Sequence, residues 1–319
     1  MLFLNKEEIF RSVKLEEVVD VIEESMKLYE TGKFEMPTRM HVDYDGNTLL
    51  LMPCYAENRV GTKLLTLTPD NKERELPVIQ GCFILNDAET GEILAFIEGS
   101  SLTALRTGAV GSVSIRNMTS KDISSVGIVG AGVQGYHQAL FASKVRAIDT
   151  IYVHDINDKR VREFKEKFSE SKDPNIIYVD YVKELVQRSD VVITATTANE
   201  PVLPDESKIF KGKHFVGIGS YKPNMREYPK AIYEKIDKII IDTEDAVDES
   251  GDITLPLENG WIGEDQIQTM GKLLNGEIDL NLNKTTFFKT VGMALFDLVT
   301  ANLVYKKAEE LDFGIEIDF

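Results

Sequence analysis

Cysteine and histidine are scarce in this chain of 319 residues, which contains two cysteines and four histidines. Cys54 and Cys82 each lie among apolar residues, so we expect reduced core thiols and no disulfide framework. The histidines do not form a set, and no HExxH helix or paired-cysteine cluster occurs, so we predict no metal site. A GxSxG nucleophile elbow is also missing, which leaves no sign of a serine hydrolase.

Lysine and arginine are also fewer than the acidic residues. The sequence has 36 Lys and Arg against 53 Asp and Glu, which gives a formal net charge of −17. Such a charge repels nucleic acids and anionic membranes. No apolar run reaches the roughly 18 residues of a membrane span, and the first residues turn charged at Lys6 without a secretion-signal pattern. We therefore expect a cytoplasmic protein with a small-molecule substrate, no nucleic acid partner and no membrane partner.

The first part of the chain mixes helices with a run of strands. Residues 14–34 carry apolar residues at helical spacing, and Gly32 is expected to end that helix. Residues 39–98 read as short strands separated by turn signals, and residues 100–118 read as a helix. The length of the whole chain suggests about two domains, and this mixture predicts an α+β organisation for the first.

From Ser125 to about Lys284 the pattern changes to alternating strands and helices. Apolar strands separated by helices are typical of a parallel, doubly wound sheet of the Rossmann type. The remaining residues predict a short extended lead and a long amphipathic helix with no strand after it. We expect this helix to return to the first domain. The predicted fold class is therefore α/β, with a doubly wound domain over residues 118–284 and a discontinuous α+β domain over residues 1–117 and 285–319.

A glycine-rich turn opens the second domain in the stretch "SVGIVGAGVQGYHQ". The glycines match GxGxxG between a strand and a helix, and Asp155 ends the next strand about 20 residues later, as the dinucleotide-binding pattern requires. In that pattern the glycines allow a tight turn, close approach of the pyrophosphate and close packing of helix on strand. The predicted cofactor contacts here are Gly130, Ala131, Gly132, Val133, Gln134, Gly135 and Asp155.

Asp155 also bears on the choice of cofactor. A carboxylate at this position accepts hydrogen bonds from the ribose hydroxyls of NAD and repels the 2′-phosphate of NADP. We therefore predict NAD. Lys159 and Arg160 follow closely and leave NADP open if Asp155 turns away.

Three cations of the first part are candidates for binding an anion. Arg39 stands at a strand start, Lys63 lies between apolar strand residues, and Arg106 follows Leu105 in a helix rich in small residues. A partly buried cation needs a counterion, which a ligand carboxylate would supply. The planar guanidinium can hold such a carboxylate bidentately.

Segments in order through nearly the whole chain resemble the ornithine cyclodeaminase and mu-crystallin family: "GTKLLTL", "LPVIQG", "LTALRTGAVG", "GIVGAGVQGYHQ", "TATTANEPVL", "GSYKPNMRE", "DESGD" and "FFKTVGMALFD". The resemblance implies an NAD(P)-dependent enzyme with hydride transfer at the carbon that bears the nitrogen and carboxylate of an amino or imino acid. It also implies a homodimer formed through the first domain, which would bind the substrate. Members of the family include ornithine and lysine cyclodeaminases, an alanine dehydrogenase, and ketimine or pyrroline-2-carboxylate reductases.

By motif, the resemblance assigns the catalytic role and the substrate carboxylate to Arg39, Lys63 and Arg106, with Lys63 also moving a proton at the substrate nitrogen. Gln80 and Tyr221 join them as implied substrate-binding residues. For the cofactor, the resemblance adds a second group of contacts, which comprises Thr107, Thr196, Thr197, Gly219, Lys289 and Gly292.

One segment departs from the cyclodeaminase pattern G-x-D-x-P-G-K-x-E, whose Asp engages the side-chain amine of the substrate. The run "GIGSYKPNMRE" places Tyr221 where that acid stands when Pro223 and Glu227 are aligned. This favours an oxidoreductase of a cyclic ketimine, such as a pyrroline-2-carboxylate reductase, or an alanine-type amino-acid dehydrogenase. Two alternatives remain: an ornithine cyclodeaminase that makes L-proline and ammonia with bound NAD, using Glu57 or Asp70 as a substitute acid, and a non-catalytic binding protein similar to mu-crystallin.

Overall fold

The structure is a computed structural model that describes residues 1–168 and 174–318, with only the backbone of Lys72. The chain separates into two compact units, Met1–Arg106 with Met293–Phe319, and Thr107–Gly292. The first boundary falls inside helix α3 (Gly99–Met118). No helix of the described residues is long and apolar enough to cross a membrane.

The first unit is built on an eight-stranded sheet in the order β16-β1-β7-β6-β5-β4-β2, with β3 paired to β4. Its strands are β1 (Leu2–Leu4), β2 (Phe34–Glu35), β3 (Met40–Tyr44), β4 (Asn47–Ala56), β5 (Arg59–Leu67), β6 (Ile79–Asp87), β7 (Ile93–Glu98) and β16 (Ile315–Glu316). Its remaining helices are α1 (Lys6–Ser12), α2 (Leu15–Thr31), the short 3-10 helix η1 (Pro69–Lys72) and α11 (Ala294–Leu311). Helix α2 ends before Gly32, which has a left-handed φ of 63°, as expected.

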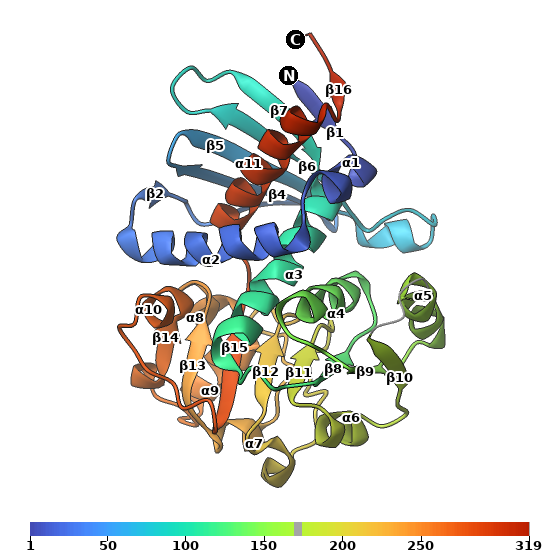
Figure 1. Cartoon of the computed structure of the whole chain (residues 1–319), viewed down its shortest axis with the longest axis vertical. Helices are drawn as coiled ribbons and strands as arrows, with labels where there is room; N and C mark the ends of the chain where they lie inside the picture. Colours follow the sequence, from blue (N-terminus) through green and yellow to red (C-terminus); the bar gives the residue numbers. More distant parts are fainter. Residues whose placement is uncertain (169–173, 319) are drawn as a thin grey trace. The chain divides into compact units, whose positions relative to one another are not determined.

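Helices α2 and α11 lie on one face of this sheet (Figure 1). The strand residues of that face form the core, because side chains alternate between the two faces of a strand. One cross-strand row of that face contains Met52, Lys63 and Phe83, which are 4%, 2% and 0% exposed. The lysine is therefore placed by its strand in an otherwise apolar layer beneath α11.

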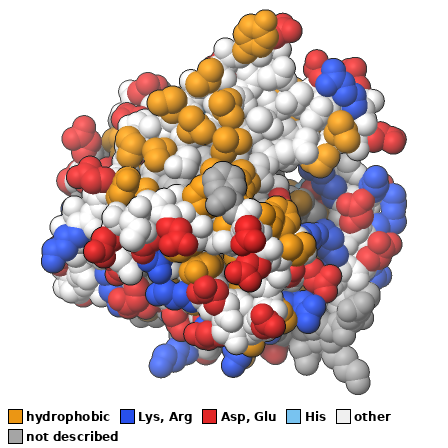
Figure 2. Space-filling model, turned by 90° about the horizontal axis from the view of Figure 1, so that it is seen from above, with side chains coloured by type: hydrophobic (Ala, Val, Ile, Leu, Met, Phe, Trp, Pro, Cys, Tyr) orange, Lys and Arg blue, Asp and Glu red, His pale blue; other side chains and the backbone are white. Residues whose placement is uncertain are grey.

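The opposite face of the sheet carries exposed apolar side chains. Met40, Val42 and Tyr55 are 57%, 49% and 53% exposed, and they belong to strands β3 and β4. Figure 2 shows a face of the molecule on which hydrophobic side chains gather. An extended apolar surface of this kind commonly marks a contact with another protein.

The second unit is a parallel sheet in the order β10-β9-β8-β11-β12-β15-β13-β14 (Figure 1). Its strands are β8 (Ser125–Val129), β9 (Thr150–His154), β10 (Asn175–Tyr178), β11 (Val191–Thr194), β12 (His214–Gly217), β13 (Ile236–Ile241), β14 (Ile267–Thr269) and β15 (Thr285–Lys289). Its helices are α4 (Val133–Val145), α5 (Asp158–Phe168), α6 (Val182–Arg188), α7 (Lys230–Tyr233), α8 (Ala246–Glu249), α9 (Gly251–Glu258) and α10 (Met270–Leu274), with 3-10 helices η2 (Ser207–Phe210) and η3 (Glu264–Gln266).

The strand order confirms the predicted doubly wound α/β fold. The chain runs outward from β8 through β9 to β10 and then returns to β11 on the other side of β8. Ligands of such sheets bind at the carboxyl ends of the strands where this reversal occurs. The fold therefore directs attention to the residues that follow β8, β9 and β11.

The structure corrects the prediction for the residues after Lys284. Thr285–Lys289 was expected as an extended lead of the first domain, but it forms β15, which is fully buried and pairs with β12 and β13. A five-residue strand without alternation of apolar and polar residues does not indicate which sheet it belongs to. The compact units consequently divide after residues 106 and 292, whereas the sequence predicts boundaries after 117 and 284. A short strand, β16, also follows α11, where none was expected.

Candidate functional site

The glycine turn links β8 to α4 and has the backbone of a ligand cradle. Gly130 has a φ of 104°, which L side chains rarely adopt. A Cβ on Gly135 would stand 1.9 Å from the carbonyl oxygen of Gly130, so glycine is required for α4 to pack on the strand. By contrast, a Cβ on Gly132 would meet no atom within 4 Å. The protein itself does not require glycine at 132, whereas a group bound against the backbone there would.

Asp155 is fixed beside this turn. Its Oδ2 accepts a hydrogen bond from the Ala131 N–H at 2.8 Å, and its Oδ1 accepts one from the Asn157 N–H at 2.8 Å. At the start of α4, Gly132 is the N-cap without a side-chain cap, and the Gln134 Oε1 is buried without a hydrogen-bond partner among the described residues. Open backbone N–H groups at a helix start and a neighbouring carboxylate are the features that hold a dinucleotide, so the residues fit this cofactor.

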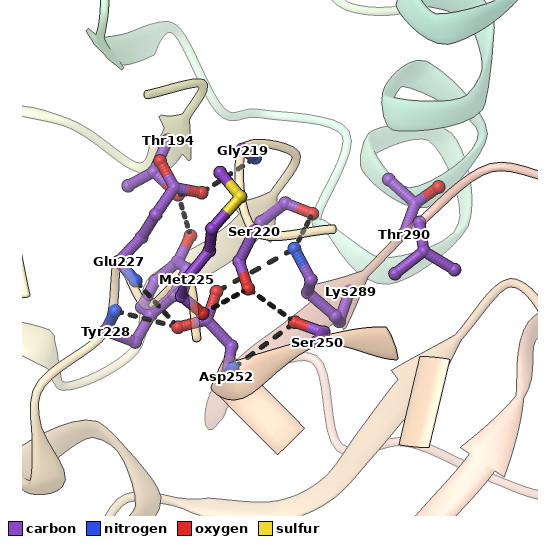
Figure 3. A network of polar contacts seen from close by, with 12 residues as sticks. Thr194, Gly219, Ser220, Met225, Glu227, Tyr228, Ser250, Asp252, Lys289 and Thr290 are labelled. Carbon is purple, nitrogen blue, oxygen red and sulfur yellow. Dashed lines mark hydrogen bonds and ion pairs between the residues drawn. The ribbon is translucent and has the colours of Figure 1, made fainter. Parts of the chain in front are cut away.

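Glu227 is the centre of a polar network at the carboxyl ends of the next strands (Figure 3). It is fully buried and accepts hydrogen bonds from the Thr194 hydroxyl at 2.9 Å and the Gly219 N–H at 2.7 Å. It also accepts from the N–H and the hydroxyl of Thr196, each at 2.8 Å. One carboxylate thereby ties the segment after β11 to the segment after β12, where the resemblance places cofactor contacts.

The loop between Gly219 and Glu227 is also closed at its base. Ser220 donates from its hydroxyl to the Met225 carbonyl oxygen at 2.6 Å, and its oxygen lies 2.8 Å from the Ser250 hydroxyl (Figure 3). Tyr221, between these ends, is 39% exposed. The loop therefore has a fixed base and an exposed tip.

Lys289 lies in the same network and is fully buried. Its Nζ donates to the Gly217 carbonyl oxygen at 3.2 Å and lies 3.7 Å from the Asp252 Oδ2 (Figure 3). Burial lowers the pKa of Lys289, and the carboxylates of Asp252 and Glu227 oppose that shift. Burial likewise raises the pKa of Asp252, to about 6. The amine of Lys289 is thus engaged inside the protein, so a cofactor contact of this residue would come from its backbone.

Asp242, which follows β13, organises the next turn. Its carboxylate accepts from the Gly292 N–H at 2.8 Å and from the Thr290 hydroxyl. Gly292 has a φ of 72°, so this turn also requires glycine. Sequence reasoning missed Asp242 and Asp252, and it used Glu227 to align the segment that contains Tyr221. The signal was present in the run "KIIIDT", where an acid directly follows buried strand residues.

The first unit contains a buried cluster of two cations and one carboxylate. Lys63 Nζ donates to Asp297 Oδ2 at 2.7 Å, and Arg106 Nε donates to Asp297 Oδ1 at 3.2 Å. Their side chains are 2%, 9% and 0% exposed for the lysine, the arginine and the aspartate. Asp297 lies in the first turn of α11 and was not predicted as a site residue, although it ends the segment "FFKTVGMALFD" that carries part of the family resemblance.

Burial is the main influence on the pKa of Lys63. Together with the positive charges of Arg106 and Arg39, it lowers the pKa of Lys63 to about 8, although Asp297 acts in the opposite direction. An amine with a pKa near neutrality can give and take a proton at physiological pH. Loss of solvent contributes more to this lowered pKa than the neighbouring cations do.

The other predicted substrate-binding residues of the first unit are Arg39 and Gln80. Arg39 is half-buried just before β3, near enough for its charge to act on Lys63. Gln80 is paired with Thr66, three positions along the ladder from the Lys63–Phe83 pair, so alternation puts its side chain on the opposite face of the sheet. The structure therefore does not bring Gln80 to Lys63.

In the second unit, Thr107 is buried and its carbonyl oxygen accepts a hydrogen bond from the Gln138 side chain at 2.6 Å. Thr197 is exposed, next to the anchored Thr196. Val133 is 57% exposed at the first position of α4. In the described part of the chain, no group of three or more His, Cys, Asp or Glu side chains is arranged to hold a metal ion.

Comparison with known proteins gives full-length matches. Residues 1–312 match the model of the ornithine cyclodeaminase/mu-crystallin family. The chain is 30% identical over 329 residues to Delta(1)-pyrroline-2-carboxylate reductase of Bacillus thuringiensis, covering 100% of both sequences. Among solved structures, the Thermococcus litoralis Delta(1)-pyrroline-2-carboxylate reductase with NADH and L-proline has a TM-score of 0.92 at 32% identity, covering 99% of this chain and 100% of that one. An archaeal alanine dehydrogenase dimer with bound NAD has a TM-score of 0.90 at 27% identity, covering 100% and 99%.

Proposed function

Because the chain belongs to the ornithine cyclodeaminase/mu-crystallin family, we propose that it is an NAD(P)H-dependent reductase of a small cyclic α-imino acid, with Δ1-pyrroline-2-carboxylate as the first substrate to test. The observation that carries this proposal is the buried cluster in which Lys63 and Arg106 share the single carboxylate of Asp297. The cluster has an excess of buried positive charge, which a substrate carboxylate would neutralise. The positive charge of the half-buried Arg39 also acts on Lys63.

The chemistry needs one hydride and one proton. When bound, the dinucleotide supplies the hydride that the imine carbon gains, or accepts it in the reverse direction. Lys63 holds the proton that the imine nitrogen gains, and its pKa of about 8 lets it exchange that proton near neutral pH. Arg39 and Arg106 bind the carboxylate and keep the neighbouring imine within reach of Lys63. An alanine-type dehydrogenase uses the same groups in the opposite direction.

The fixed orientation of Asp155 supports NAD as the cofactor. Replacing Asp155 with serine is expected to relax the preference for NADH over NADPH, since the carboxylate that repels the 2′-phosphate is removed. The preference is measured as the ratio of kcat/KM for the two cofactors. An unchanged ratio would show that Asp155 does not face the ribose, and NADP would then become the leading cofactor.

Glu227 argues against the cyclodeaminase alternative. Its carboxylate accepts hydrogen bonds from Thr194, Thr196 and Gly219, so it is committed to the protein and not available to a substrate ammonium. Tyr221 brings no negative charge at the position where cyclodeaminases carry their acid. A δ-amine of ornithine would therefore lack a partner from this loop.

Two assays with the full chain separate the candidates. Pyrroline-2-carboxylate, piperideine-2-carboxylate, or pyruvate with ammonia is mixed with NADH or NADPH, and the absorbance of the reduced cofactor is followed. In parallel, ornithine with NAD is tested for proline and ammonia. Cofactor oxidation with an imine is the expected result. Conversion of ornithine without a change in cofactor absorbance would replace this proposal by the cyclodeaminase, and cofactor binding without any turnover would favour the binding protein.

The exposed apolar face of the first sheet supports a homodimer as part of the proposal. Met40, Val42 and Tyr55 are each about half exposed on two neighbouring strands. A second copy of the chain is a suitable partner, because closed two-fold contacts use the same patch on both subunits. The mass in sedimentation equilibrium would be twice that of the 35.9 kDa chain.

A further inference from the structure

We propose that Asp297 is a positioning residue of the reaction: its carboxylate holds Lys63 and Arg106 through one donor each and leaves their remaining donors to the substrate. This inference rests on the proposed function and deepens it. The segment "FFKTVGMALFD", which carries part of the family resemblance, ends in Asp297, but the resemblance gave this residue no role.

The geometry places Asp297 between the two cations. It is 0% exposed in the first turn of α11, and its two carboxylate oxygens are divided between Lys63 Nζ at 2.7 Å and Arg106 Nε at 3.2 Å. Lys63 reaches it from β5, and Arg106 reaches it from α3. Three elements that are distant in sequence therefore meet at one carboxylate, and the direction of both cationic side chains depends on it.

The donors that remain are suited to a second carboxylate. Among the described residues, Asp297 is the hydrogen-bond partner of both Lys63 Nζ and the Arg106 guanidinium. An ammonium has further N–H donors, and a guanidinium bound through Nε keeps both terminal nitrogens for bidentate binding. Asp297 thus orients Arg106 through its Nε and leaves the two terminal guanidinium nitrogens for the carboxylate of the ligand.

Asp297 has a second effect, which is to raise the pKa of Lys63 through its negative charge. Arg106 on α3 and Arg39 before β3 both disfavour a protonated Lys63, and Asp297 is the acid that opposes them. Asp297 also acts on Cys54 of β4, whose thiol pKa is raised to about 12 by burial and by the charge of Asp297, so the thiol stays neutral. Removing the carboxylate would leave Lys63 with two positive neighbours and no counterion.

The expected result of Asp297→Asn follows from this arrangement. In the reductive direction Lys63 must start protonated, so kcat/KM for the imino acid falls as the pH rises through the pKa of Lys63. Loss of the carboxylate lowers that pKa further, and the midpoint of this fall should move to lower pH by about one to three units, the usual effect of an adjacent opposite charge. The profile is measured at saturating NADH, with thermal unfolding and NADH binding as readouts of the fold.

The matched control is Thr300→Val, three residues further along α11. The Thr300 hydroxyl is buried without a hydrogen-bond partner among the described residues, so an isosteric replacement should leave the pH profile where it is. A lower rate with an unchanged midpoint in Asp297→Asn would overturn the proposal, since it would show only a structural role. Absence of turnover in the wild type would instead refute the proposed function.

A second variant keeps the proposal testable if Asp297→Asn does not fold. Asp297→Glu retains the charge but moves the oxygens by one methylene group in a buried site. We expect a midpoint close to wild type together with a raised KM for the imino acid, because the two cations no longer point to the same place. Wild-type kcat and KM in a folded Asp297→Glu protein would contradict the positioning role.

Discussion

Replacing Lys63 with methionine is expected to lower turnover by about 10²- to 10⁴-fold, the usual contribution of a positioned acid or base. Methionine fits the apolar row between Met52 and Phe83, and Asp297 keeps its contact with Arg106. The variant should therefore fold. NADH binding should stay close to wild type, because the glycine turn and Asp155 belong to the other compact unit. Steady-state kinetics and a fluorescence titration of NADH measure the two effects separately.

Met52→Leu is a suitable control for this variant. Met52 pairs with Lys63 across the strands and is 4% exposed, so its replacement changes the packing around the lysine without changing charge. Exchanges of this kind are usually tolerated in a core, and activity should be retained. If the methionine variant at position 63 kept most of its activity, Lys63 would have no part in proton transfer.

Replacing Gly135 with alanine is expected to abolish NADH binding and to destabilise the second unit. The new Cβ would stand 1.9 Å from the Gly130 carbonyl oxygen and 3.0 Å from Ile128 Cγ2, and a backbone carbonyl in a tight turn cannot move aside cheaply. Helix α4 would have to separate from β8. Overpacking of this kind costs about 1–3 kcal/mol, which should appear as a lower melting temperature.

Gly132→Ala separates cofactor binding from folding in the same turn. Its Cβ meets no protein atom within 4 Å, so the melting temperature of the apoprotein should not change. A methyl group there would obstruct the close approach of the pyrophosphate, and NADH affinity should fall at least about tenfold, equal to 1.4 kcal/mol. Wild-type affinity in Gly132→Ala would show that the turn does not hold the pyrophosphate.

The sequence predicted the features that depend on local pattern. Alternating strands and helices indicated the doubly wound sheet, and the spacing of Gly130, Gly132, Gly135 and Asp155 indicated the turn and its neighbouring carboxylate. Both are seen in the structure, and the family resemblance is confirmed. These features could be read because each is set by residues close together in the chain.

The features that depend on distant pairing were missed. Asp297 lies 234 residues from Lys63 along the chain, and its place at the end of "FFKTVGMALFD" does not indicate which side chains it contacts. The strand β15 has no polar alternation, so its insertion between β12 and β13 could not be derived. For Gln80, which was expected to bind substrate, the strand register places the side chain on the face opposite that of Lys63, and a register cannot be read from one strand alone.

Under the proposed function, in which Tyr221 binds substrate, the anchored loop between Gly219 and Glu227 bears on how substrate choice can change in evolution. Its ends are held by Glu227 and by the Ser220–Met225 hydrogen bond, while Tyr221, Lys222 and Asn224 are exposed. Mutations at the exposed positions leave the anchoring bonds intact, so new side chains can be tried there at little cost in stability. The hydrogen bonds that anchor the loop therefore do not depend on the side chains at its exposed tip. Directed evolution of substrate range would best begin with a library at those three positions.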